Sequence, residues 1–117
     1  MSQRTERVGK VARQVLGDAI RSLKDPRVGF VTVTAVRVSA DLRHARVAVS
    51  VLGDEAARKA SLAGLESAKP VLRGELGRQM RMKYLPDLTF VLDEGAERAE
   101  RIEELLHKIH EHDQGDE

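Results

Sequence analysis

The sequence predicts an α+β domain in which helices pack on one face of a small three-stranded sheet. Three observations carry this prediction. Apolar residues recur at helical spacing over residues 5–23, they alternate with period two over residues 45–51, and a proline interrupts a second helical segment at position 70. In order along the chain, we expect helix, strand, strand, helix, helix, strand and helix. The 117 residues suffice for one domain of this kind.

The first helix is expected over residues 5–23. Its apolar residues follow the i, i+3, i+4, i+7 series and form a stripe that would face a core: Val8, Val11, Ala12, Val15, Leu16, Ala19, Ile20 and Leu23. The other side of this helix is basic. Asp25 precedes Pro26, and the residue before a proline disfavours helical conformation, so the helix should end there.

Two strands joined by a tight turn should follow. Residues 30–39 are rich in β-branched side chains, and their alternation changes phase near Thr34 and Ala35, which predicts a bulge or a bend. A turn at residues 40–43 leads to residues 45–51. The valines there alternate strictly, which predicts a hairpin with one buried face.

A second helix is expected over residues 55–68. It must be interrupted at Lys69 and Pro70, because proline lacks an amide donor and clashes with the preceding turn. Proline suits the first position of a new helix, however. We therefore expect a kink formed by Ala68, Lys69 and Pro70, followed by a third helix that runs to Met80.

The C-terminal part differs from the rest of the chain in charge. Residues 1–92 hold 17 Lys and Arg against 9 Asp and Glu, whereas residues 93–117 hold 3 against 10. We place the domain at residues 5–93, with a last strand at residues 88–92. Residues 94–117 should form an acidic helix, packed on or beside the sheet, and a frayed tail. This separation of charge favours a polyanionic partner for the basic part, but a solvated surface with a solubilising acidic end explains it equally well.

The composition excludes several classes of function. The chain has no cysteine, which excludes disulfides, thiolate catalysis and cysteine-ligated metal sites. It has no P-loop, no dinucleotide-binding glycine pattern and no Ser/His/Asp grouping, so we expect no enzyme, no cofactor and no small-molecule substrate. His107 and His110 are spaced to share a metal, but no third ligand accompanies them, and a solvated helix end explains them better. Without a membrane span or an N-terminal signal segment, a cytoplasmic protein is expected.

Basic residues on two segments are the candidates for contact with nucleic acid. One segment is the first helix, and the other follows the kink, where a helix N-terminus presents free amides and partial positive charge to phosphate. The alternative for the kink is a purely structural bend with solvated arginines. The residues expected to contact RNA phosphates are Arg7, Lys10, Arg13, Lys69, Arg73, Arg78, Arg81 and Lys83.

Two further features limit how RNA could be recognised. A GxxG sequence at residues 74–77 matches the backbone-gripping loop of KH domains, but it contains Glu75 and falls inside the predicted third helix. We interpret it as two glycines that the helix tolerates. Phe30, Tyr84 and Phe90 are the only aromatic residues, too few for a stacking sheet, so contact should occur mainly through backbone charge.

Five segments resemble the ribosome-binding factor A family. They are residues 24–28 (KDPRV), 31–34 (VTVT), 36–42 (VRVSADL), 45–53 (ARVAVSVLG) and 81–90 (RMKYLPDLTF). The resemblance implies a type II KH-like domain that binds the free small (30S) ribosomal subunit and its 16S rRNA. It further implies a role in late maturation of that subunit, including processing of the 5′ end of 16S rRNA. This role matters most in the cold. It implies no catalytic activity and no cofactor, and we expect a monomer.

The chain departs from this family at the kink. Members usually have Ala-x-Gly there, and this chain has Ala68, Lys69 and Pro70. Proline forbids the positive φ that glycine permits, so the kink must form by another backbone route, and we expect its role to be structural first.

Two other functions stay open: a general KH-like RNA binder or chaperone, and a protein–protein module whose partner recognises the acidic last helix.

Overall fold

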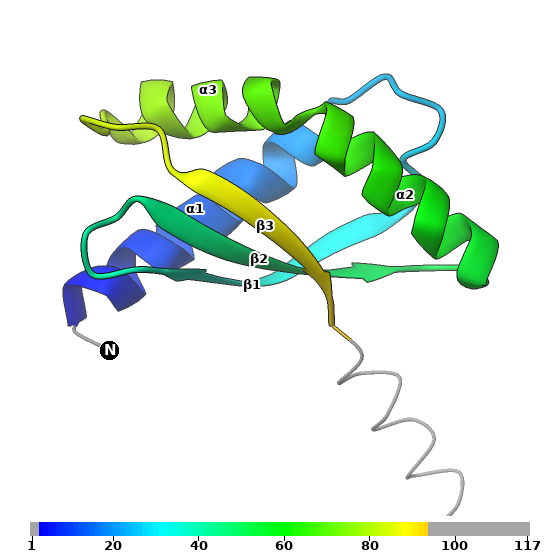
Figure 1. Cartoon of the computed structure of the whole chain (residues 1–117), viewed down its shortest axis with the longest axis horizontal. Coiled ribbons are helices and arrows are strands. Elements are labelled where there is room, and N and C mark those ends of the chain that lie inside the picture. Colours follow the sequence, from blue (N-terminus) through cyan, green and yellow to red (C-terminus); the bar gives the residue numbers. More distant parts are fainter. Residues whose placement is uncertain (1–2, 94–117) are drawn as a thin grey trace, which may run out of the picture.

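The computed structural model describes residues 3–93 of the chain, which form a three-stranded sheet covered on one face by helices (Figure 1). The helices are α1 (Gln3–Arg21), α2 (Glu55–Ser67) and α3 (Lys69–Met80), and the strands are β1 (Val31–Val38), β2 (His44–Val51) and β3 (Asp87–Leu92). The α+β class and the order of these elements are confirmed. The predicted last helix, with His107 and His110, and the acidic tail lie outside the described residues.

The sheet has the order β1-β2-β3, with β2 in the centre. β1 and β2 are antiparallel, as expected for a hairpin, whereas β3 is parallel to β2. A parallel pair needs a crossover connection, and α2 and α3 provide it. The predicted bulge is confirmed, because Val33 pairs with Val49 and Ala35 pairs with Ala48, which leaves Thr34 as the extra residue of β1.

The core lies between the sheet and the helices. Alternate residues of each strand face it, and α1, α2 and α3 supply leucines that are fully buried, namely Leu16, Leu65, Leu72 and Leu76. The predicted apolar stripe of α1 was wrong at Val11, which is 51% exposed at the edge of the stripe. Gly9 is buried instead, because α1 passes so close to β1 that a side chain has no room there.

The predicted kink is confirmed at Ala68, which ends α2 and begins α3. Its backbone has φ −86° and ψ −3°, so the bend uses no left-handed conformation. The carbonyl of Ala68 accepts a hydrogen bond from the N–H of Leu72 at 2.9 Å, and Pro70 lies in the first turn of α3. The chain therefore changes direction with a single residue between two right-handed helices.

Candidate nucleic-acid interface

Arg73 anchors the chain between α3 and β3. Its Nε donates a hydrogen bond to the carbonyl of Pro86 at 2.9 Å, and one terminal nitrogen donates to the carbonyl of Leu85 at 3.2 Å. The same guanidinium lies 3.5 Å from a carboxylate oxygen of Asp87. The sequence predicted a phosphate contact here, but the donors of Arg73 are committed to the protein itself.

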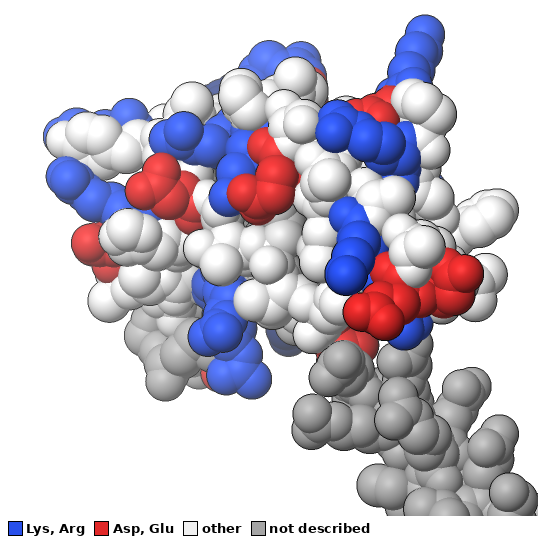
Figure 2. Space-filling model, turned by 45° about the vertical axis from the view of Figure 1, so that its right-hand side comes forward, with Lys and Arg blue, Asp and Glu red and all other residues white. Residues whose placement is uncertain are grey.

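The other cations of the kink and of α3 have acidic neighbours. The Nζ of Lys69 lies 2.9 Å from the carboxylate of Glu66, and its side chain is only 30% exposed. It also lies 6.0 Å from the ring centre of Phe90. Arg78 forms an ion pair with Glu75 one turn earlier in α3. On the face that Figure 2 shows, Asp and Glu side chains likewise lie among the Lys and Arg side chains.

The GxxG sequence does not form a loop. Gly74 and Gly77 both lie within α3, as the sequence analysis predicted. Hydrogen bonds from Gln79 and from Arg78 lower the pKa of Glu75 below its ordinary value, so that its carboxylate is charged at neutral pH. A negative charge at this position disfavours the approach of a phosphate.

Three predicted cations of α1 have no acidic partner among the described residues, in contrast to those of α3. Arg7, Lys10 and Arg13 are all exposed and recur every three residues, which places them on the same side of the helix. Arg13 donates a long hydrogen bond of 3.4 Å to the carbonyl of Thr34. Within residues 3–93, Arg7 and Lys10 have no ion pair. This side of α1 is therefore the part of the predicted surface that retains unmatched positive charge.

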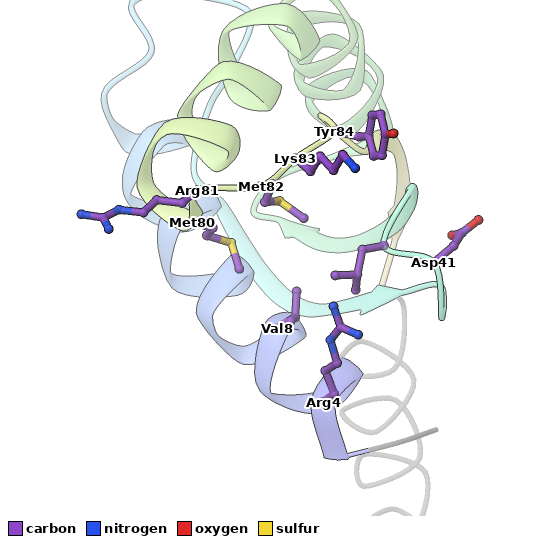
Figure 3. A pocket seen from close by; sticks show the side chains of 9 residues that line it. Arg4, Val8, Asp41, Met80, Arg81, Met82, Lys83 and Tyr84 are labelled. Carbon is purple, nitrogen blue, oxygen red and sulfur yellow. The ribbon is translucent and has the colours of Figure 1, made fainter.

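Arg81 and Lys83 lie at a pocket of about 390 Å³ at the far end of α3 from the kink (Figure 3). The pocket opens where the beginning of α1, the turn between β1 and β2, and the segment after α3 meet. Four partly buried apolar residues form its floor, and it is bordered by three cations, one carboxylate and one tyrosine. The apolar residues are Val8, Leu42, Met80 and Met82. The cations are Arg4, Arg81 and Lys83, the carboxylate is that of Asp41, and the tyrosine is Tyr84.

The backbone around this pocket is unusual at two positions. Leu42 has φ 60° and Arg81 has φ 51°, and no other non-glycine residue in the described part of the chain has a positive φ. Leu42 lies in the turn between β1 and β2. Arg81 caps the end of α3, where its N–H donates to the carbonyl of Gly77. Both residues line the pocket.

Two side chains fix the turn that borders the pocket. Asp41 accepts hydrogen bonds from the hydroxyl of Ser39 at 2.6 Å and from the N–H of Arg43 at 3.0 Å. These hydrogen bonds hold the pKa of Asp41 below its ordinary value, and the one from Ser39 has the largest effect. The guanidinium of Arg43 lies 4.4 Å from the ring centre of Tyr84, and so connects this turn to the segment after α3 by a cation–π contact.

The open face of the sheet carries two arginines that the sequence analysis did not select. Arg37 of β1 and Arg46 of β2 are direct cross-strand partners, and both are exposed. Like charges directly opposite each other destabilise a sheet. Neither forms an ion pair within residues 3–93. The alternation in each strand placed both on the solvent side, but only the register reveals that they are neighbours.

No three His, Asp or Glu side chains gather as possible metal ligands within residues 3–93. None of the helices described is both long and apolar enough to cross a membrane.

Comparisons with known proteins agree on one family. The family model for ribosome-binding factor A matches residues 4–106. A ribosome-binding factor A of Halothermothrix orenii is 44% identical over 115 residues, which cover 97% of this chain and 94% of the relative. The crystal structure of ribosome-binding factor A from Thermus thermophilus is similar with a TM-score of 0.68 and 32% identity, over 75% of this chain and 94% of that one.

A second similar structure is of the same Thermus thermophilus protein. A homology model of the Thermus thermophilus ribosome binding factor A, fitted into a cryo-electron microscopy map of its complex with the 30S subunit, has a TM-score of 0.63 and 32% identity. The match covers 74% of this chain and 91% of that model.

Proposed function

Because the chain belongs to the ribosome-binding factor A family, we propose that it binds the free 30S ribosomal subunit and assists late maturation of that subunit. The observation that carries this proposal is the similarity to a relative that was fitted into a map of a 30S complex. The proposal includes processing of the 5′ end of 16S rRNA, a requirement that is greatest in the cold, and action as a cytoplasmic monomer. It assigns the protein no catalytic step and no cofactor.

We propose residues 5–93 as the ribosome-binding domain, with residues 94–117 as an acidic C-terminal appendage. Of the cations predicted to contact RNA, those without an acidic partner in the described part of the chain are the best candidates for rRNA phosphates: Arg7, Lys10, Arg13, Arg81 and Lys83. Lys69, Arg73 and Arg78 were predicted to join them. Their ion pairs and hydrogen bonds favour structural roles for these three instead.

The mechanism that we propose is steric and conformational. The protein binds an immature arrangement of rRNA more tightly than the mature one, so it raises the population of the immature arrangement until neighbouring components are placed. Release follows when the mature contacts remove the binding site. Such a mechanism needs differential affinity alone, which a basic surface of fixed shape can provide.

Sedimentation of the full chain with purified ribosomal particles tests the proposal. We expect the protein to sediment with free 30S subunits and to be absent from 50S subunits and joined 70S ribosomes. Sedimentation at the top of the gradient even at low salt would contradict ribosome binding. Equal affinity for 30S subunits and for unrelated single strands would favour a general RNA binder, and loss of association on removal of residues 94–117 would favour a protein partner.

Charge-reversed variants test the surface. Replacement of Arg7 and Lys10 by Glu should abolish sedimentation with 30S subunits at moderate salt, because a cation that neutralises a phosphate releases counterions and an acid in its place repels that phosphate. Lys10→Glu alone is compared with Lys59→Glu, which changes the net charge equally, since Lys59 is 77% exposed and lies on α2. If both changes weakened sedimentation with 30S subunits equally, net charge, and not contact through α1, would be the cause.

A further inference from the structure

We infer that the pocket in Figure 3 holds one unstacked nucleotide of single-stranded RNA, with the base on the apolar floor and the adjoining phosphates at the basic rim. This inference rests on the proposed function, because the RNA in question is rRNA. It adds a defined site and a defined ligand, which a surface of charge alone does not supply.

The size and lining of the pocket suit a flat heteroaromatic ring. Its volume of about 390 Å³ lies at the lower end of the range for small-molecule sites, which is about 300 to 1,000 Å³. Met80 and Met82 contribute unbranched, polarisable thioethers that adapt to a ring face. Figure 3 shows that they come from the end of α3 and the segment just after it.

The backbone conformation of Leu42 points to a retained use of its side chain. Glycine adopts a positive φ without steric penalty, so it would be the least costly residue at this position. The chain instead has an apolar side chain there, on the pocket floor. Non-glycine residues in such conformations cluster at ligand sites, where the surrounding structure compensates for the strain.

The charges at the rim favour a phosphate-bearing ligand. Arg4 and Lys83 have no acidic partner within residues 3–93, and the Nζ of Lys83 lies 5.5 Å from the ring centre of Tyr84. Arg81 also lines the pocket, but Figure 3 shows its guanidinium directed away from it. The single acid, Asp41, is occupied by hydrogen bonds in its own turn, and Figure 3 shows it directed away from the pocket. An apolar peptide side chain would fit the floor but would leave Arg4 and Lys83 without a counter-charge.

Tyr84 limits the site to one nucleotide. Tyr84 is 50% exposed and lines the pocket, and the described residues place no second aromatic ring there. RNA bases in proteins stack on aromatic rings. The guanidinium of Arg43 covers one face of the Tyr84 ring, so the ring offers its other face to one base and not to a run of bases.

The test compares the affinity of the full chain for a short single-stranded RNA with its affinity for the same strand carrying one abasic nucleotide at the centre. Stacking of a single base changes affinity by about fivefold or more. We therefore expect the abasic strand to bind at least fivefold more weakly. Equal affinities would overturn the inference. This measurement uses the unaltered protein, so no loss of folding can mimic the result.

Met82→Ala assigns the effect to the pocket. It should weaken binding of the intact strand and leave binding of the abasic strand unchanged. Val71→Ala is the control, because Val71 is an apolar residue of α3 that is 60% exposed and does not line the pocket. A base effect that survives Met82→Ala would place the nucleotide elsewhere and refute this site.

Sedimentation with 30S subunits separates the inference from the proposed function. If the chain binds 30S subunits but does not distinguish the two strands, the nucleotide pocket is wrong and the proposed function stands. If Met82→Ala then still releases the chain from the subunit, the pocket holds a protein side chain. If the chain does not bind 30S subunits at all, the proposed function fails whichever strand it prefers.

Discussion

Gly9 of α1 lies directly against the carbonyl oxygen of Val36 in β1, so closely that a Cβ on Gly9 would be 2.5 Å from that oxygen. Both partners are backbone and cannot turn aside. We expect Gly9→Ala to lower the free energy of unfolding by about 1 to 3 kcal/mol, the usual cost of overpacking. Chemical denaturation of the full chain measures this change.

Gly74→Ala is the control for this prediction. Gly74 also lies within a helix, but a Cβ there would meet no atom within 4 Å. Alanine should therefore stabilise α3 by up to about 1 kcal/mol through its higher helix propensity. If both changes destabilised the protein equally, the close approach of α1 to β1 would not be the cause.

Ser61 of α2 holds the segment that follows α1. It is 1% exposed, its hydroxyl accepts a hydrogen bond from the N–H of Gly29 at 3.1 Å, and it donates to the carbonyl of Arg27 at 3.4 Å. We expect Ser61→Ala to destabilise the protein by about 0.5 to 1.5 kcal/mol for each hydrogen bond lost, because the N–H of Gly29 loses its acceptor and the carbonyl of Arg27 its donor. Ser67→Ala, at an exposed position of α2, should stay within about 0.5 kcal/mol of the parent in thermal unfolding.

Arg73 and Lys10 should respond in opposite ways to replacement by alanine. Loss of Arg73 removes the hydrogen bonds to Leu85 and Pro86, so Arg73→Ala should lower the melting temperature and leave the salt dependence of RNA binding unchanged. Lys10→Ala should leave the melting temperature unchanged and reduce the slope of log K against log salt by about 0.7 to 1. A reduced slope for Arg73→Ala would show that Arg73 does contact an RNA phosphate.

The pair of Asp25 and Arg27 should make stability depend on pH in the acid range. Side-chain and backbone hydrogen bonds from Arg27 lower the pKa of Asp25 in the folded state. The unfolded state then binds the proton more readily, so the contribution is complete above the unfolded pKa of about 3.9 and is lost as pH falls through the folded pKa. Asp25→Asn should lower the melting temperature at neutral pH and have progressively less effect as the pH falls below the unfolded pKa and through the folded one. An equal effect at neutral and at acid pH would mean that packing, and not ionisation, matters at Asp25.

The local elements of the fold could be predicted because each has a short-range cause. The apolar stripe of α1 reflects helical periodicity, the extra residue at Thr34 shows as a change of phase, and Pro70 can interrupt a helix only where it stands. Val11 was predicted to be buried and is exposed, because the width of the buried stripe depends on how α1 lies on the sheet.

The candidate site could be predicted only in part. Arg7 and Lys10 follow from helical spacing, and the structure leaves their charges unmatched. Arg73 has the same local signature but is held by Pro86, thirteen residues later in the chain. Arg37 and Arg46 become neighbours only through the register of two strands, which no single segment encodes.

The sequence by itself therefore determined the helices, the strands, the bulge and the kink, since each depends on residues within a few positions of one another. The tertiary structure alone decided which cations are free and where the pocket lies. Val8, Leu42 and Met82 come from three distant segments, and they form one floor only because the packing of α1, the hairpin and α3 brings those segments together. Charge and apolar surface are properties of residues, whereas a binding site depends on the distances between them.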